Sequence, residues 1–218
     1  MNQTMITLLF NGTIETLYMT LACTVISYVI GLPLGVVLYI TDKGGIAPLP
    51  VVNAIVGFIV NFLRSVPFLI LLVALLPFTR FVVGTTIGST ATIVPLVVAA
   101  APYIARMVES SLKEVNSGVI EAAQSMGSSK MQIITKVLVP EAKPSLLVGG
   151  AIAITTILGY SAMAGFVGGG GLGAIAINYG YYRYQSDMML ITVLLLVIIV
   201  QIFQEAGMKI ARVSDKRL

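Results

Sequence analysis

Few residues in this sequence could carry out covalent chemistry. The 218-residue chain has no histidine and a single cysteine, Cys23, which lies in an apolar run. Histidine-based triads, Cys-His dyads and HExxH zinc sites are therefore excluded, and one cysteine cannot form a disulfide within the chain. We expect no catalytic residue and no metal ligand, and we interpret Cys23 as a small apolar residue of a buried or lipid-facing helix.

A glycine-rich segment formally matches the phosphate-binding pattern GxGxxG. That pattern requires a preceding strand and an acidic residue about twenty positions later. Here the segment follows an apolar run, and Asp187 comes after only fourteen positions. The ATP-binding pattern GxxxxGK[ST] does not occur anywhere in the sequence. We interpret the glycines as flexible backbone at the outer end of a span, where they could bend, pack tightly or form a gate. They are Gly168, Gly169, Gly170, Gly171 and Gly173.

Arg64 is the one ionisable residue that lies deep within an apolar run. Such residues are costly in a membrane and usually face a cavity or a partner. Arg64 and its neighbour Ser65 could line a transport pathway or hold a dimer together. Alternatively, the span begins later and the arginine extends to the cytoplasmic face. Tyr160, Ser161 and Met163 are further pathway candidates, for which helix packing is the alternative.

A polar stretch rich in small residues, VIEAAQSMGSSKMQIITKVLVPEA, interrupts the apolar sequence. Ser117 could cap a short helix over Gly118 to Met126, and Gly127 suits the left-handed position that ends a helix. Ser129 and Gln132 form an S-x-x-Q capping box, which predicts that a second helix starts at once. We expect this second helix to end at the prolines Pro140 and Pro144.

The short helix carries residues suited to contact with another surface. Ala122, Ala123 and Gly127 are small and would let a partner approach the backbone closely, and positions 123 and 127 share a face. Apolar anchors could come from Ile120, Met126 and Met131. The alternative is an ordinary amphipathic helix that lies on the bilayer or on its own bundle, and the residues alone leave both interpretations open.

The composition indicates that these segments are held by an all-α membrane protein. Hydrophobic residues make up 57% and charged residues only 10% of the chain, whereas soluble domains contain about 25% charged residues. A membrane-crossing helix needs about 20 mostly apolar residues. We expect one domain, residues 1–218, with a cytoplasmic segment at about 108–143. Its five spans are expected at about 16–41, 51–76, 89–107, 146–164 and 188–206.

Lysine and arginine predict the orientation, because they are enriched in cytoplasmic segments. With the N-terminus outside, the inner segments hold ten of the thirteen basic residues, the outer segments hold Arg80 and Arg183, and Arg64 lies within a span. The inner residues are Lys43, Arg106, Lys113, Lys130, Lys136, Lys143, Lys209, Arg212, Lys216 and Arg217. We therefore expect an outer N-terminus and a cytoplasmic C-terminus. The basic tail requires no nucleic acid as a partner.

One pattern in the polar stretch resembles the signature of bacterial ABC importer permeases, EAA-x3-G-x9-I-x-L-P. Here it reads Glu121-Ala122-Ala123, Gly127 and a proline at Pro140, with valine in place of both isoleucine and leucine. Longer stretches, including FLRSVPFLILLVALLPFTR and GYSAMAGFVGGGGLG, resemble methionine permeases of this family. The similarity extends over nearly the whole chain.

The resemblance implies a type I ABC importer transmembrane domain in the bacterial inner membrane, working as a homodimer. Glu121, Ala122, Ala123, Gly127 and Pro140 would belong to a coupling helix that docks on a cytoplasmic ATPase dimer, which binds ATP and magnesium in place of this chain. An external methionine-binding lipoprotein would deliver L- and D-methionine. The alternatives are another amino acid or small solute, or an ion-coupled transporter. The latter would need acidic or histidine relays within the membrane.

Overall fold

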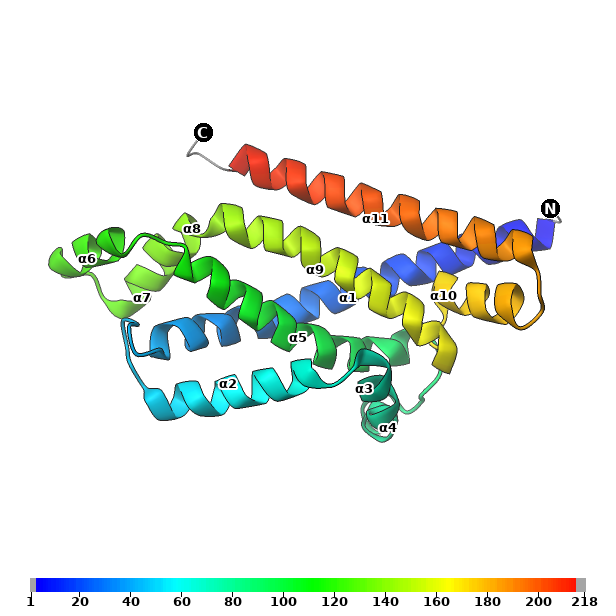
Figure 1. The fold of residues 1–218 in the computed structure, drawn as a ribbon, viewed down its shortest axis with the longest axis horizontal. Coiled ribbons are helices and arrows are strands. Elements are labelled where there is room, and N and C mark those ends of the chain that lie inside the picture. The colour runs from blue at the N-terminus through cyan, green and yellow to red at the C-terminus, as the bar shows by residue number, and fades with distance from the viewer. Residues whose placement is uncertain (1–2, 215–218) are drawn as a thin grey trace.

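The computed structural model describes residues 3–214, and every regular element in that range is helical (Figure 1). Lys216 and Arg217, which the charge count includes, lie outside the described residues. The longest helices are α1 (Gln3–Thr41), α5 (Ser89–Lys113), α9 (Lys143–Met163) and α11 (Ser186–Ser214). The others are α2 (Pro50–Ser65), α3 (Phe68–Ala74), α4 (Leu76–Val83), α6 (Ser117–Ser125), α7 (Lys130–Gln132), the π-helix η1 (Ile133–Leu138), α8 (Val139–Glu141), the 3₁₀-helix η2 (Ala164–Val167), α10 (Gly171–Ile175) and the π-helix η3 (Ala176–Tyr181).

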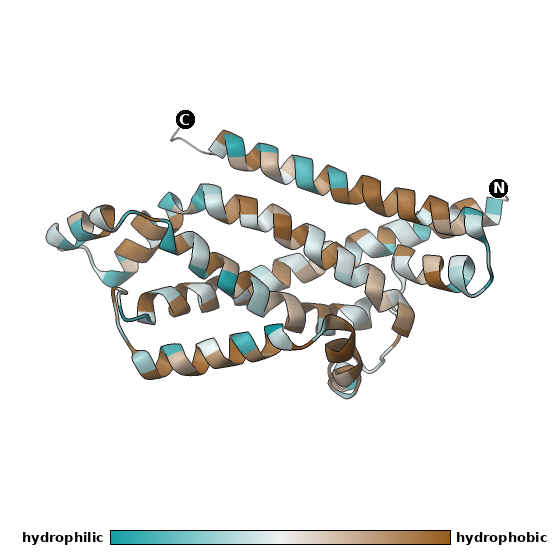
Figure 2. Ribbon diagram, viewed as in Figure 1, coloured by the Kyte–Doolittle hydropathy of each residue, from teal (hydrophilic) through white to brown (hydrophobic). Residues whose placement is uncertain are grey.

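The long helices run roughly along one axis of the molecule, with α6 at one end and the start of α1 at the other (Figure 1). The last turns of α11 lie at the same end as α6. Hydrophobic residues dominate the middle of the bundle, whereas hydrophilic residues gather on α6 and toward the end of α11 (Figure 2). This pattern matches an apolar layer between two polar ends.

Four helices in the described part of the chain are long and apolar enough to cross a membrane, and α2 and α3 meet the same length and composition test only when they are taken together as a bent pair. The segment expected as one span at 51–76 is bent by 102° between α2 and α3. The cause is Pro67, which disfavours helical backbone at the preceding residue. Val66 is accordingly extended, with φ −80° and ψ 125°. Arg64 therefore lies at the end of α2 and not in the middle of a straight helix.

Close packing of α1 on α5 forms the centre of the bundle. Gly31 and Gly35 are buried on α1, and a Cβ atom at either position would come within 2.8 Å of the backbone oxygens of Ala101 and Ala105 respectively. Small residues allow such close approach between membrane helices. α1 begins well before the expected span, and α5 and α11 also continue beyond theirs. The helices therefore extend past the apolar layer at both ends.

Candidate functional site

The short helix α6 is shaped by its own sequence. The side chain of Asn116, and not Ser117 as expected, caps its start, because the Asn116 Oδ1 accepts a 2.8 Å hydrogen bond from the Gly118 amide. The helix ends before Gly127, whose φ of 77° is left-handed as predicted. The capping box of Ser129 and Gln132 is present with both of its hydrogen bonds. These contacts are local, so the segment takes its shape without a partner.

The two faces of α6 have different neighbours. Ile120 and Ala123 are buried, at 8% and 3% exposure, in a cluster that includes Leu112 and Leu138. Of the small residues of the segment, Ala123 packs against its own chain, whereas Ala122 and Gly127 are exposed. The outward face of α6 and its C-terminal cap expose Val119, Glu121, Ala122 and Met126, and Met131 of α7 is exposed as well.

Pro140 does not end the second helix of the segment, contrary to expectation. The backbone widens to a π-helix over Ile133–Leu138, and the Val139 amide bonds to the Ile134 oxygen five residues back. Pro140 falls in the first positions of α8, where a missing N–H is tolerated. The chain thus stays nearly continuously helical from α7 into α9, and α6 rests against this helical path.

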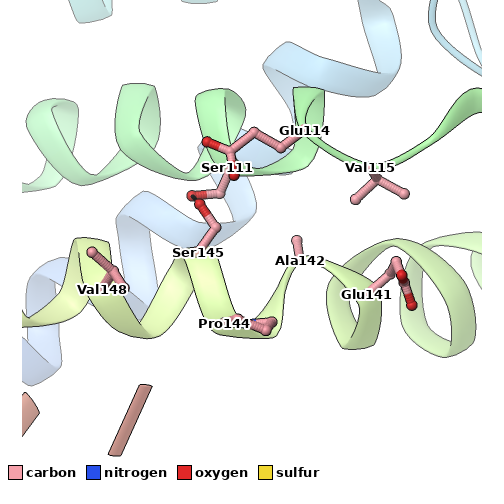
Figure 3. Close-up of a pocket in the computed structure, with 8 residues that line it drawn as sticks. All are labelled: Ser111, Glu114, Val115, Glu141, Ala142, Pro144, Ser145 and Val148. Carbon is pink, nitrogen blue, oxygen red and sulfur yellow. Dashed lines mark hydrogen bonds between the residues drawn. The ribbon is translucent and has the colours of Figure 1, made fainter. Parts of the chain in front are cut away.

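A pocket of about 380 Å³ lies where this segment joins the bundle, between the end of α5 and the start of α9 (Figure 3). Ser111 and Ser145 point toward each other inside it, and the Ser145 hydroxyl donates a 3.0 Å hydrogen bond to Ser111. Glu114 and Glu141 are among the residues that line it. Ser111 and Ser145 directly connect the two helices that flank the polar segment.

A buried ion cluster lies nearby on α5, and the sequence interpretation missed it. Glu109 is only 7% exposed and accepts from Arg106 at 2.6 Å and from Lys113 at 2.7 Å. Arg106 also donates to Asn61 of α2, and Lys113 lies 3.4 Å from Asp42 after α1. The i, i+3 and i+4 spacings of the α5 residues are visible in the sequence and could have revealed the cluster. Together these contacts join α1, α2 and α5.

Asp42 and Lys113 are the more exposed members of this cluster, with side chains 43% and 50% exposed. The backbone amide of Lys43, which donates to its carboxylate, and then Lys113 lower the pKa of Asp42 below its ordinary value. A lowered pKa means that this contribution to stability is present above the ordinary pKa and is lost as pH falls through the lowered one. Because Asp42 is well exposed, water screens the effect.

The structure brings together two of the candidate pathway residues. Arg64 and Tyr160 both line a pocket of about 170 Å³. Ser161 is buried at 1% exposure and donates to the Leu158 oxygen, so it packs between helices. Met163 is 48% exposed and Ser65 donates to the backbone of its own helix. Neither of these two is among the residues that line this pocket.

Arg64 also lies far from the end of the bundle that carries α6. α2 begins after the loop at that end (Figure 1), and Arg64 follows fourteen residues after Pro50. At 1.5 Å per residue this corresponds to about 21 Å along the helix. The position does not support the alternative in which Arg64 reaches the face that bears the polar segment.

The glycine segment is a tightly packed turn, which corresponds to the tight packing that was one of the alternatives for these glycines. Gly168, Gly170 and Gly171 all have positive φ, between 70° and 83°. A Cβ atom at Gly173 would overlap the backbone oxygen of Ala162, and one at Gly169 would lie 2.7 Å from the Ala164 oxygen. Only glycine fits these positions, because the turn needs both left-handed backbone and close contact.

Side chains from two other helices bond to this turn. The Gly171 amide donates to the Glu15 carboxylate at 2.7 Å, and the Leu172 amide donates to the Thr16 hydroxyl at 2.8 Å. Thr92 of α5 donates to the Gly169 oxygen at 3.2 Å. These bonds fix the turn to α1 and α5. They join residues as many as 156 positions apart, and no local sequence signal marks them.

A family model described as "Binding-protein-dependent transport system inner membrane component" matches residues 31–209. A Vibrio cholerae protein named "Probable D-methionine transport system permease protein MetI" is 49% identical, covering 96% of this chain and 93% of its own length. The Bacillus subtilis "Methionine import system permease protein MetP" is 44% identical, with coverages of 97% and 96%.

Solved structures with the same fold include a chain of the MetNI methionine ABC transporter in an inward-facing conformation, in its native crystal form. It is 50% identical with a TM-score of 0.98, and the match covers 99% of this chain and all of that one. A chain of an amino acid ABC transporter with histidines has a TM-score of 0.78 at 20% identity, with coverages of 95% and 94%. The second similarity concerns the fold alone.

Proposed function

The chain belongs to the family of binding-protein-dependent transport system inner membrane components, and from this premise we propose that it is the permease subunit of a methionine importer. The observation that carries the proposal is the 50% identity and TM-score of 0.98 with a chain of a methionine ABC transporter, over 99% of this chain. Relatives named as methionine permeases align over nearly the same range. The substrate would be L-methionine, D-methionine or both.

Energy for transport would come from a separate ATPase, because this sequence has no GxxxxGK[ST] motif. ATP and magnesium would bind to that subunit. Each chain has one α6, and an ABC transporter has two ATPase subunits. If each ATPase subunit binds one α6, two copies of this chain are needed, so we infer a homodimer. An external methionine-binding lipoprotein would deliver the substrate to the end opposite α6.

The outward face of α6 would contact the ATPase. Glu121 and Ala122 are exposed there. Ala123 would contribute indirectly, because its buried side chain packs α6 against the rest of the chain. Gly127 would set the direction of the chain after α6, and Pro140 would lie in the helical path that connects the segment to α9. Because α6 packs on the helical path into α9, closure of the ATPase pair upon ATP binding would move the bundle toward an outward-open state. Hydrolysis would reverse this movement.

The transport pathway would run past Arg64, Tyr160 and Met163, with Ser65 close to its wall. Ser161 and the glycine turn would form a rigid part of the outer half of the bundle. If this region opens and closes the pathway, the glycine turn would move as a rigid unit. This assignment rests on the shared pocket of Arg64 and Tyr160 and on the exposure of Met163.

Uptake of labelled methionine tests the cargo. Cells that lack other methionine importers should gain uptake when this chain is produced together with its ATPase and binding protein. Competition with unlabelled L- and D-methionine should show which enantiomer is carried. Transport of a different amino acid without methionine uptake would reject the cargo but keep the permease assignment.

Reporter fusions test the orientation. The proposal places the chain in the bacterial inner membrane with an outer N-terminus and a cytoplasmic C-terminus, since the basic residues gather at the end that carries α6. A fusion after Gly84 should report an outside location, and a fusion after Ser128 should report an inside one. An outside location for Ser128 would contradict docking of α6 on a cytoplasmic ATPase.

A further inference from the structure

Arg64 carries a charge that no neighbour neutralises. Within residues 3–214 it forms no ion pair and no hydrogen bond through its side chain. Arg106, the arginine of the buried ion cluster, is by contrast bonded to Glu109 and Asn61. Arg64 is exposed on this chain, and a charged residue at membrane depth usually faces a cavity or a partner, so a group from outside the chain can reach its guanidinium.

The pocket beside Arg64 has two kinds of wall. One wall is aromatic, since the rings of Phe68 and Tyr160 stack with centroids 4.4 Å apart and planes only 8° from parallel. Tyr103 from α5 lines the pocket as well. Among the described residues, the hydroxyls of Tyr103 and Tyr160 have no hydrogen-bond partner. The pocket therefore combines one cation, two available hydroxyls and an apolar surface.

This combination fits an amino acid with an apolar side chain. A guanidinium group binds a carboxylate through two parallel hydrogen bonds, and aromatic rings favour contact with thioether sulfur. The volume of about 170 Å³ accommodates a small solute and not a peptide. The break between α2 and α3, just after Arg64, leaves this charge at a helix end beside the pocket.

We propose that this pocket is a substrate subsite in which Arg64 binds the α-carboxylate of the transported amino acid, while the stacked rings of Phe68 and Tyr160 contact its side chain. The proposal rests on the function proposed above and identifies the contacts that recognise the substrate. A competing explanation is that Arg64 pairs with an acidic residue of a second copy of this chain. The two explanations predict different behaviour of the dimer when the charge is removed.

The test uses the complete complex, with ATPase and binding protein, in proteoliposomes. Initial methionine uptake is measured for wild type, Arg64→Gln and Arg64→Lys, and the oligomeric state is checked by size-exclusion chromatography. Arg80→Gln on α4 is the matched control, because Arg80 is exposed like Arg64 but does not line the pocket.

Arg64→Gln should reduce uptake about 10- to 100-fold, the range typical of a lost hydrogen bond to a charged group. Lysine should restore part of the uptake, and Arg80→Gln should transport like wild type. Tyr103→Phe, which removes only a hydroxyl, should reduce uptake by about 2- to 10-fold. All four variants should elute as the wild-type dimer complex.

Uptake by Arg64→Gln at the wild-type level would overturn the subsite. Loss of the dimer in Arg64→Gln, with the dimer kept in Arg80→Gln, would also overturn it and assign Arg64 to the interface between copies. A wild-type complex that transports another amino acid but not methionine would reject the proposed cargo. The Arg64 comparison would then be repeated with that amino acid, because the carboxylate contact is common to both.

Discussion

The outer glycine turn (residues 168–173) and the inner polar segment (residues 119–142) both reverse or redirect the chain, but different contacts stabilise them. Both need left-handed glycine to change the direction of the chain. In the outer turn, Gly171 is buried and bonded to Glu15, and Gly173 packs directly on Ala162. In the inner segment, a Cβ atom at Gly127 would meet no atom within 4 Å. The outer glycines therefore serve both conformation and packing, whereas Gly127 serves conformation alone.

This difference separates a part that holds the fold together from a part that is free to meet a partner. The outer turn depends on side chains of α1 and α5, so damage there should unfold the bundle. The inner segment makes its own caps, and within it α6 packs on the rest of the chain through Ile120 and Ala123. Changes on its outward face should leave the chain folded and affect only association.

The largest effect is expected at Gly173. Gly173→Val would place side-chain atoms on the Ala162 backbone and should destabilise the protein by about 3 kcal/mol or more. The expected result is little or no folded protein after purification in detergent, measured by yield and thermal unfolding. Gly159→Ala on α9 is the control, since a Cβ atom there meets nothing within 4 Å. A stable Gly173→Val protein would contradict the rigid turn.

Two adjacent alanines of α6 allow a sharper comparison. Ala123 is buried, so Ala123→Leu should lower the free energy of unfolding by about 1–3 kcal/mol through overpacking. Ala122 is exposed, so Ala122→Leu should leave the melting temperature unchanged but weaken co-purification with the ATPase. If both variants lose stability equally, α6 has no free outward face.

Local features of both regions could be predicted from the sequence, because neighbouring residues determine them. The extent of α6, the left-handed Gly127 and the capping box of Ser129 and Gln132 depend on atoms three or four positions apart. The helical class and the number of spans follow from composition and the length of apolar runs. The bend at Pro67 also had a local cause, but the apolar residues on both sides of it predicted one span without indicating the bend.

Contacts between distant segments could not be predicted in the same way. The bond from Gly171 to Glu15 spans 156 positions, and only the packed bundle brings the two together. The same holds for the choice of Ala123 over Ala122 as the buried alanine, since both are equally small and apolar. Helical spacing marked a possible face of α6, but packing against α5 and the π-helix decided which side faces inward.

A smaller effect is expected from the hydrogen bond that joins α1 to the outer turn. Glu15→Ala leaves the Gly171 amide without its acceptor, and the loss of a charge-assisted bond should cost about 1.5–3 kcal/mol. The matched change in the inner segment is Asn116→Ala, which removes a helix cap and should cost about 1 kcal/mol. Thermal unfolding of the two variants in one detergent ranks them. If Asn116→Ala loses more stability than Glu15→Ala, the inner segment and not the outer turn contributes more to the stability of the fold.

A small effect on stability is expected at Gly127, together with the clearest effect on coupling. An alanine there meets no clash, so Gly127→Ala costs only the strain of left-handed backbone, about 1 kcal/mol. That strain would favour a different direction for the chain after α6 and should lower transport while the protein still folds. Asparagine tolerates left-handed backbone better, so Gly127→Asn should recover much of the transport. ATP hydrolysis and methionine uptake by the reconstituted complexes provide the comparison. If alanine and asparagine lower uptake equally, the conformation of Gly127 does not matter, and its lack of a side chain at the partner surface becomes the explanation.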